Sequence, residues 1–177
     1  MVGTGRFSIQ NPTETFIPTM KNILVVCTGN VCRSPMATAL FRKEIAERGL
    51  AEEVFVDSAG TYAMVGHPAS EGSVNAMAQR GLDISDHRAK QLTADLVEKA
   101  DLIVVMEERH RRSIFVTWPR AIVKTLLLSE LSGDHAEIDD PYGGEQWEYD
   151  ETATIIEGYV QRGMPALLKR LGISAEA

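Results

Sequence analysis

Hydrophobic positions along the chain alternate between short continuous apolar runs and longer stretches with helical spacing. Four apolar runs predict strands, at residues 22–26, 53–60, 101–106 and 121–126. Three stretches with helical spacing predict helices, at about residues 35–48, 69–80 and 147–171. The first apolar run, NILVV, is unbroken, which is typical of a strand buried on both faces. Strands that alternate with helices predict a parallel sheet covered on both faces, with a ligand site at the carboxyl ends of its strands.

Length and composition favour a single soluble domain. The 177 residues can build one sizeable core, and 44% hydrophobic with 24% charged residues is typical of a globular protein. Residues 1–19 contain two prolines and no apolar run of signal-peptide length, so we expect a flexible N-terminal extension. Met20 is an alternative start, and residues 20–173 are predicted to form the domain. No stretch approaches the roughly 20 apolar residues that span a bilayer.

Net charge and cysteine content limit the classes of binding partner and the cellular compartment that we expect for this protein. A formal net charge of -7 argues against nucleic acid or an anionic membrane as the main partner. The chain has two cysteines, Cys27 and Cys32, which cannot build the disulfide framework of a secreted domain. A reducing cytoplasm is therefore expected. Two cysteines without a neighbouring histidine are also too few for a tetrahedral metal site, so we predict no metal.

The turn after the first predicted strand, CTGNVCRS at 27–34, has the features of an anion-binding loop. Gly29 and Asn30 tolerate the positive φ that lets successive backbone N–H groups point inward. Pro35 favours a helix directly afterwards, whose N-terminus attracts negative charge. The planar guanidinium of Arg33 can hold two oxygens of one anion. These features predict a phosphate-sized site, and the loop lacks the G-x-x-x-x-G-K pattern of nucleotide binding.

Cys27 lies where such a loop would activate a thiol. Inward N–H groups, a helix N-terminus and an arginine all favour the thiolate, a nucleophile facing a bound phosphoryl group. Ser34 could donate a hydrogen bond to the sulfur. The alternative for Cys27 is a small buried hydrophobic residue at a strand end. Cys32 either packs behind the loop or acts as a resolving thiol that forms a disulfide with Cys27 under oxidation.

A proton donor for the leaving group is expected in EIDDPYGG, residues 137–144. Asp140 precedes Pro141, which favours an extended backbone, and Tyr142 could form an aromatic wall beside it. Asp139 is an equal candidate on these grounds. The alternative for the segment is a solvated acidic loop.

Together these motifs resemble the low-molecular-weight protein tyrosine phosphatases. The resemblance covers about residues 21–171 in the expected order. It rests on VCTGNVCRSPMA in the loop, DSAG at 57–60, HRAKQL at 87–92, ADLIVVM at 100–106 and DPY at 140–142.

The resemblance implies a flavodoxin-like three-layer α/β fold with a four-stranded parallel sheet and no metal or organic cofactor. It implies phosphorylated proteins as substrates, with inorganic phosphate as product and competitive ligand. Cys27 would be the nucleophile, Arg33 would bind the phosphoryl group, and Asp140 rather than Asp139 would be the general acid.

The resemblance also implies roles for residues around these three. Ser58 and His87 match positions that support the loop, although His87 by itself would be interpreted as a surface histidine. The implied phosphate-binding loop consists of Thr28, Gly29, Asn30, Val31, Cys32 and Ser34. The implied substrate pocket is lined by Val31, Tyr62, Met64 and Tyr142.

Some positions depart from the tyrosine-specific pattern. Many tyrosine-specific members carry a tryptophan in the loop after SAGT, where this chain has Tyr62 and Met64. Residues Glu107 to His110 depart from the M-D-x-x-N pattern that follows the third strand. The DPYGG segment and a histidine near position 110 resemble the bacterial protein arginine phosphatases. That branch has threonine at the position of Val31, whereas valine suits an aromatic leaving group better.

Phosphotyrosine is therefore the expected substrate and phosphoarginine the alternative. An arsenate reductase is a weaker alternative, because no cysteine follows Cys32 to relay a disulfide. A catalytically silent phosphate-binding module is weaker too, since both Cys27 and Asp140 are present.

Overall fold

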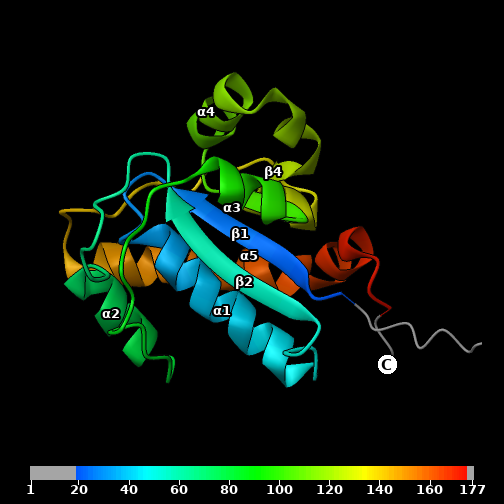
Figure 1. The fold of residues 1–177 in the computed structure, drawn as a ribbon. Coiled ribbons are helices and arrows are strands. Elements are labelled where there is room, and N and C mark those ends of the chain that lie inside the picture. Colours follow the sequence, from blue (N-terminus) through cyan, green and yellow to red (C-terminus); the bar gives the residue numbers. More distant parts are fainter. Residues whose placement is uncertain (1–18, 175–177) are drawn as a thin grey trace, which may run out of the picture.

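Strands and helices alternate along most of residues 19–174, the part of the chain that the computed structural model describes (Figure 1). The strands are β1 (Lys21–Cys27), β2 (Val54–Gly60), β3 (Leu102–Val105) and β4 (Thr125–Leu127). The α-helices are α1 (Arg33–Glu47), α2 (Glu71–Ala78), α3 (Ala94–Lys99), α4 (Glu108–Thr117) and α5 (Gln146–Leu171). Two 3-10 helices are η1 (Pro119–Lys124) and η2 (Leu128–Ser132). The expected N-terminal extension lies, except for its last residue, outside the described residues.

The four strands form one parallel sheet in the order β2-β1-β3-β4. Helices α1, α2 and α5 cover one face, and α3 and α4 cover the other (Figure 1). Side chains of β1 alternate between the two hydrophobic cores: Val25 and Cys27 belong to the core under α1 and α5, whereas Leu24 and Val26 belong to the other. The predicted flavodoxin-like three-layer fold is confirmed.

The connection from β1 to α1 turns within five residues at the carboxyl edge of the sheet. Asn30 has a φ of 58°, a conformation that asparagine adopts more readily than most residues. Helix α1 begins at Arg33, two residues before the predicted start at Pro35. A proline is tolerated in this first turn because the first N–H groups of a helix have no intrahelical partner. The sequence therefore ends a central strand and starts a helix at one point on the sheet edge.

The prediction of a strand over 121–126 is wrong for most of its length. Residues Pro119–Lys124 form η1, and only Thr125–Leu127 form β4. An apolar run does not by itself distinguish a buried strand from a short helical turn, and here Val123 is exposed while Ala121 is buried.

Helices α3 and α4 were not predicted, because α3 has only 6 residues and each of the two helices buries few side chains. Within α4, His110 and Ile114 are the buried residues, four positions apart on one side of the helix, and the apolar Phe115 and Val116 are exposed. α5 is long and amphipathic, and no helix within residues 19–174 is both long and apolar enough to cross a membrane.

Candidate active site

Asn30 fixes the loop between β1 and α1 from behind. Its side chain is fully buried and donates to the hydroxyl oxygens of Ser34 and Ser58, at 2.8 and 2.9 Å. Its Oδ1 accepts from the backbone N–H of Lys90 at 2.9 Å, and its carbonyl lies 2.7 Å from Nε2 of His87. A buried amide with these partners is fully satisfied and rigid. The residues predicted to support the loop therefore contact it directly.

Cys27 is the last residue of β1 and is buried at the edge of this loop. Its Sγ lies 3.0 Å from Oγ of Ser34. Because Asn30 already donates to that Oγ, the Ser34 hydroxyl proton is free to point at the sulfur. The three side chains form a chain of hydrogen bonds that ends at Cys27.

The segment after β2 is held against the loop by backbone hydrogen bonds. The N–H of Tyr62 donates to the carbonyl of Thr28, and the N–H of Met64 donates to that of Gly29, both at 3.0 Å. Glycine is required at Gly60, since a Cβ there would lie 2.4 Å from the carbonyl oxygen of Thr28. This close approach places the Tyr62 and Met64 side chains beside Cys27.

Arg33 is buried and oriented by three acceptors. Its Nη1 donates to Oε2 of Glu107 and to the carbonyl of Ile138, both at 2.6 Å, and its Nη2 lies 3.2 Å from Oδ2 of Asp140. Its Nε has no partner among the described residues although it is buried. Buried donors are rarely left unpaired, so this N–H is available to an anion in the loop.

Glu107 is the main carboxylate beside Arg33. Burial pushes the pKa of Glu107 upward, but hydrogen bonds from Arg109 and Arg33 outweigh burial and hold this pKa below its ordinary value. Oε2 of Glu107 accepts from Nη2 of Arg109 at 2.7 Å. An ionised Glu107 therefore fixes the guanidinium of Arg33 from the side of α4.

His110 holds the other end of the loop as a neutral imidazole. Its Nδ1 accepts from the backbone N–H of Glu107 at 3.2 Å, so the ring proton lies on Nε2, which donates to Oγ1 of Thr28 at 2.8 Å. Burial, followed by the positive charge of Arg33, lowers the pKa of His110 to about 4. The geometry and the pKa agree on an uncharged ring at neutral pH.

This depressed pKa predicts that the protein loses stability in mild acid. Above pH 6.5, the ordinary pKa of histidine, the ring is neutral in both folded and unfolded chains. As the pH falls from 6.5 toward 4, the unfolded chain binds a proton that the folded chain does not, so the free energy of unfolding decreases. His110 should account for roughly 1 to 3 kcal/mol of this decrease. Urea unfolding at several pH values should show a smaller decrease for His110→Asn, and parallel pH profiles would contradict the assignment.

One pocket of about 190 Å³ opens over the loop. Asp140 lines it and pairs with Arg33, whereas Asp139 does not line it. The backbone N–H of Tyr142 donates to Oδ1 of Asp140 at 3.2 Å, which fixes the carboxylate over the pocket. The lining residues are Cys27, Thr28, Gly29, Val31, Cys32, Tyr62, Met64, Asp140 and Tyr142. All four residues predicted for the substrate pocket are among them.

Cys32 is as buried as Cys27, and its Sγ lies 3.1 Å from Oγ of Ser70. Burial raises the pKa of Cys32, so its thiol is protonated at neutral pH. Both cysteines are free thiols, and the resolving role of Cys32 stays a prediction. Within residues 19–174 no three His, Cys, Asp or Glu side chains gather as metal ligands would.

Several residues at the site were not assigned a role from the sequence. Glu107 and His110 follow the third strand, and a place after a buried strand of a parallel sheet was the signal that could have identified them. Lys90 and Ile138 act through backbone atoms, which no side-chain pattern reveals.

Comparison with known proteins agrees with this arrangement. The model of the family described as low molecular weight phosphotyrosine protein phosphatase matches residues 22–172. The chain belongs to this family. The resemblance found in the loop, DSAG and DPY motifs is thereby confirmed.

Both branches considered from the sequence occur among its relatives. The chain is 42% identical to the low molecular weight protein-tyrosine-phosphatase Ptp of Acinetobacter johnsonii, over 77% of this chain and 91% of that protein. It is 40% identical to the protein-arginine-phosphatase of Bacillus subtilis, over 77% of this chain and 89% of that protein. A solved structure of the tyrosine phosphatase Wzb from Escherichia coli K30, in complex with sulphate, matches with a TM-score of 0.76 and 33% identity, covering 84% of this chain and 99% of that one.

Proposed function

We propose that this member of the family hydrolyses phosphotyrosine in proteins through a phosphocysteine at Cys27. The observation that carries the proposal is that Cys27 and Asp140 line one small pocket, while Asp140 pairs with Arg33, whose buried Nε has no partner among the described residues. A nucleophile, a cationic anchor and a proton donor are the groups that phosphoryl transfer to a thiol requires.

In the first step the Cys27 sulfur attacks phosphorus in line with the bond to the leaving oxygen. The S–P bond forms as the P–O bond breaks, and the loop amides with Arg33 stabilise the charge on the three equatorial oxygens. Asp140, protonated for this step, gives its proton to the departing phenolic oxygen. Glu107 and the Ile138 carbonyl keep the guanidinium in place during this change.

In the second step water attacks the phosphocysteine. Asp140, now ionised, accepts a proton from that water, and inorganic phosphate leaves as the S–P bond breaks. The hydroxyl of Ser34, 3.0 Å from the sulfur, stabilises the thiolate that departs. Since this cycle needs a reduced nucleophile, we place the protein in the cytoplasm, where its two free thiols stay reduced.

An aryl leaving group suits the walls of the pocket. Val31 and Met64 supply apolar surface close to Cys27, and the exposed rings of Tyr62 and Tyr142 stand at the mouth. Aromatic side chains favour stacked or edge-to-face contact with another ring. A phosphotyrosine side chain would bury its ring between these residues.

Phosphoarginine is the second candidate substrate. The identity with the protein-arginine-phosphatase of Bacillus subtilis and the carboxylates near the pocket, Asp140 and Glu107, favour it. Valine at position 31 argues the other way, because it offers no hydroxyl to a guanidinium leaving group.

Replacing Asp140 with asparagine should slow hydrolysis most for poor leaving groups. Asparagine keeps the size of the side chain but cannot donate the proton, so phosphotyrosyl peptides should lose roughly 10² to 10³ in kcat/KM. The leaving group of an aryl phosphate with an acidic phenol, such as p-nitrophenyl phosphate, needs less help from a proton donor. The kcat/KM for such a substrate should therefore fall much less. Steady-state kinetics on both substrates measures the difference, with Asp139→Asn as the matched control. An equal loss on both substrates would contradict the role of general acid.

A further inference from the structure

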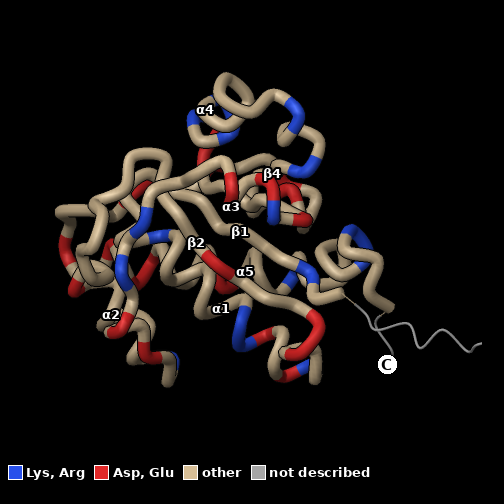
Figure 2. The backbone as a smooth tube through the Cα atoms, viewed as in Figure 1, with Lys and Arg blue, Asp and Glu red and all other residues tan. Residues whose placement is uncertain are grey.

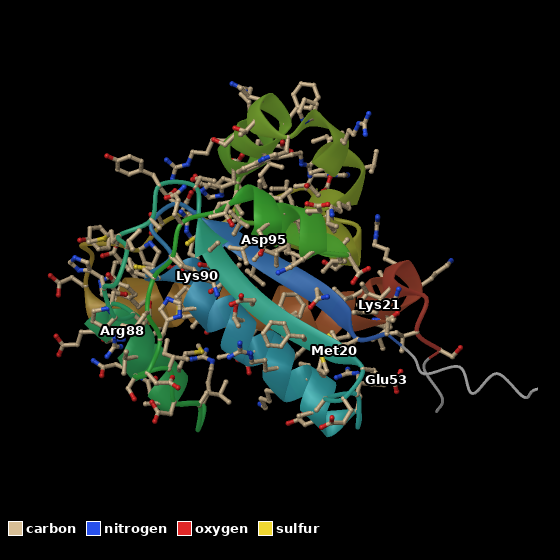
Figure 3. All side chains as sticks on the ribbon, in the orientation of Figure 1. Met20, Lys21, Glu53, Arg88, Lys90 and Asp95 are labelled. Atoms are coloured by element: carbon tan, nitrogen blue, oxygen red, sulfur yellow. The ribbon has the colours of Figure 1, made fainter. Side chains whose placement is uncertain are left out.

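A second and larger cavity, of about 530 Å³, lies behind the catalytic loop. It is an open cavity between one face of α1, residues Asp57 and Ser58 of β2, and the connection from α2 to α3. Figure 3 labels Arg88 and Lys90, which belong to this connection and line the cavity. None of its lining residues lines the catalytic pocket. Its volume is within the range of sites that hold small organic molecules.

The α1 wall of the cavity contains a buried hydroxyl without a partner. Thr38 is only 6% exposed, and its Oγ1 forms no hydrogen bond with the described residues. Pro35, Thr38, Ala39 and Arg42 follow helical spacing, so they form one stripe along the cavity. Neighbouring atoms cover this Oγ1, so a ligand reaches it by displacing them, and the cost of an unpaired buried hydroxyl favours that displacement.

Positive charge prevails in this cavity although the whole chain is acidic. Four cations line it, Arg42, Lys43, Arg88 and Lys90, against three carboxylates, Asp57, Asp83 and Asp86. Lys90 and Asp57 neutralise each other at 2.6 Å. Within residues 19–174 no ion pair joins Arg42, Lys43 or Arg88 to a carboxylate. Figure 2 shows Lys and Arg positions in blue on α1 and on the connection from α2 to α3.

The cavity also has an apolar side, formed by Pro35, Ala39, Leu82 and Ile84. A ligand that satisfies both sides carries an anionic group for Thr38 and the cations and a compact apolar body for this surface. Inorganic ions lack the apolar body.

Three residues of the cavity wall also hold the catalytic loop. Ser58, His87 and Lys90 contribute the hydrogen bonds that bind Asn30 from behind, through Oγ, Nε2 and the backbone N–H respectively. A molecule in the cavity would brace these residues and, through Asn30, the position of the loop that binds phosphate.

We propose that this cavity is a second ligand site, for a small organic anion with a carboxylate or phosphate group, and that its occupation tightens phosphate binding at the catalytic loop. Coupling of this kind is reciprocal: the anion strengthens phosphate binding by the same factor by which phosphate strengthens binding of the anion.

Binding is tested by NMR on the full chain saturated with inorganic phosphate, so that the catalytic loop is filled. The probes are phenylacetate, phenylphosphonate and the uncharged phenylacetamide. At least one of the two anions should shift the amide signals of residues 35–43 and 82–90 saturably, and phenylacetamide should bind about tenfold more weakly. Which anion binds more tightly identifies carboxylate or phosphate as the preferred group.

Thr38→Val tests the site itself. Valine matches threonine in shape and removes only the unpartnered hydroxyl, so the fold should keep its stability while affinity for the anion falls about tenfold. Thr117→Val, on exposed α4, is the control and should bind as the wild type does. Shifts confined to residues 27–33, equal binding of phenylacetamide, or unchanged affinity in Thr38→Val would each overturn the site.

The coupling is tested by calorimetry of inorganic phosphate with and without saturating anion. The dissociation constant of phosphate should fall about fivefold when the cavity is occupied, and no change would overturn the coupling. Neither the NMR experiment nor the calorimetry measures catalysis, so a failure here is distinguishable from a failure of the proposed phosphatase activity.

Discussion

Cys27→Ser should lower kcat for a phosphotyrosyl peptide by at least about 10⁴-fold, the order of loss seen when an enzyme's nucleophile is removed. A serine hydroxyl is a much weaker nucleophile than a cysteine sulfur and a poorer leaving group from phosphorus, so both steps of the cycle should be slowed. The loop keeps its shape, because Asn30 and its partners do not depend on the sulfur. The dissociation constant of inorganic phosphate should therefore change little.

Cys32→Ser is the matched control, since it makes the same substitution five positions along the loop. It should retain most of the turnover under reducing conditions. Calorimetry with phosphate and single-turnover kinetics separate binding from chemistry. Wild-type turnover in Cys27→Ser would contradict the mechanism, and lost phosphate binding would show that the sulfur supports the loop.

Arg33→Lys should lower kcat/KM by about 10³-fold even though the positive charge is kept. Arginine donates to Glu107 and the Ile138 carbonyl through Nη1 and faces Asp140 through Nη2, while Nε has no partner among the described residues and can donate to the phosphoryl oxygens. A lysine ammonium is a compact point charge, so it cannot donate hydrogen bonds in all of these directions at once. The affinity for inorganic phosphate should fall as well, because Arg33 binds the anion in the ground state.

Arg170→Lys, at the exposed end of α5, is the control for this substitution and should leave the kinetics unchanged. Thermal unfolding of both variants shows how much of the loss of activity comes from reduced stability of the fold. A folded Arg33→Lys protein with activity near that of the wild type would show that charge alone, without the directed hydrogen bonds, is sufficient.

The sequence made β1, the loop and the start of α1 predictable because each has a strong local signal. The unbroken apolar run of β1 suits a strand buried on both faces, and Gly29, Asn30 and Pro35 mark a tight turn followed by a helix. Since a parallel sheet places its sites at the carboxyl ends of strands, the position of the site followed from these elements.

The other features of the site depend on contacts between segments that are distant in the sequence. Asp139 and Asp140 are equivalent in local sequence, and only the fold places Asp140 beside Arg33. Glu107 lies far from Arg33 along the chain, and the role of Lys90 comes from a backbone N–H. Helix α4 was not predicted because it buries only His110 and Ile114, and its contact with the loop is made by the buried His110.

The measurement that tests the proposed function most directly is phosphate release from matched phosphotyrosyl and phosphoarginyl peptides, with reduced protein and with Cys27→Ser as the blank. The apolar wall at Val31 and Met64 predicts a clear preference for phosphotyrosine in kcat/KM. A preference for phosphoarginine would contradict the proposed substrate and would mean that the carboxylates near the pocket outweigh its apolar wall.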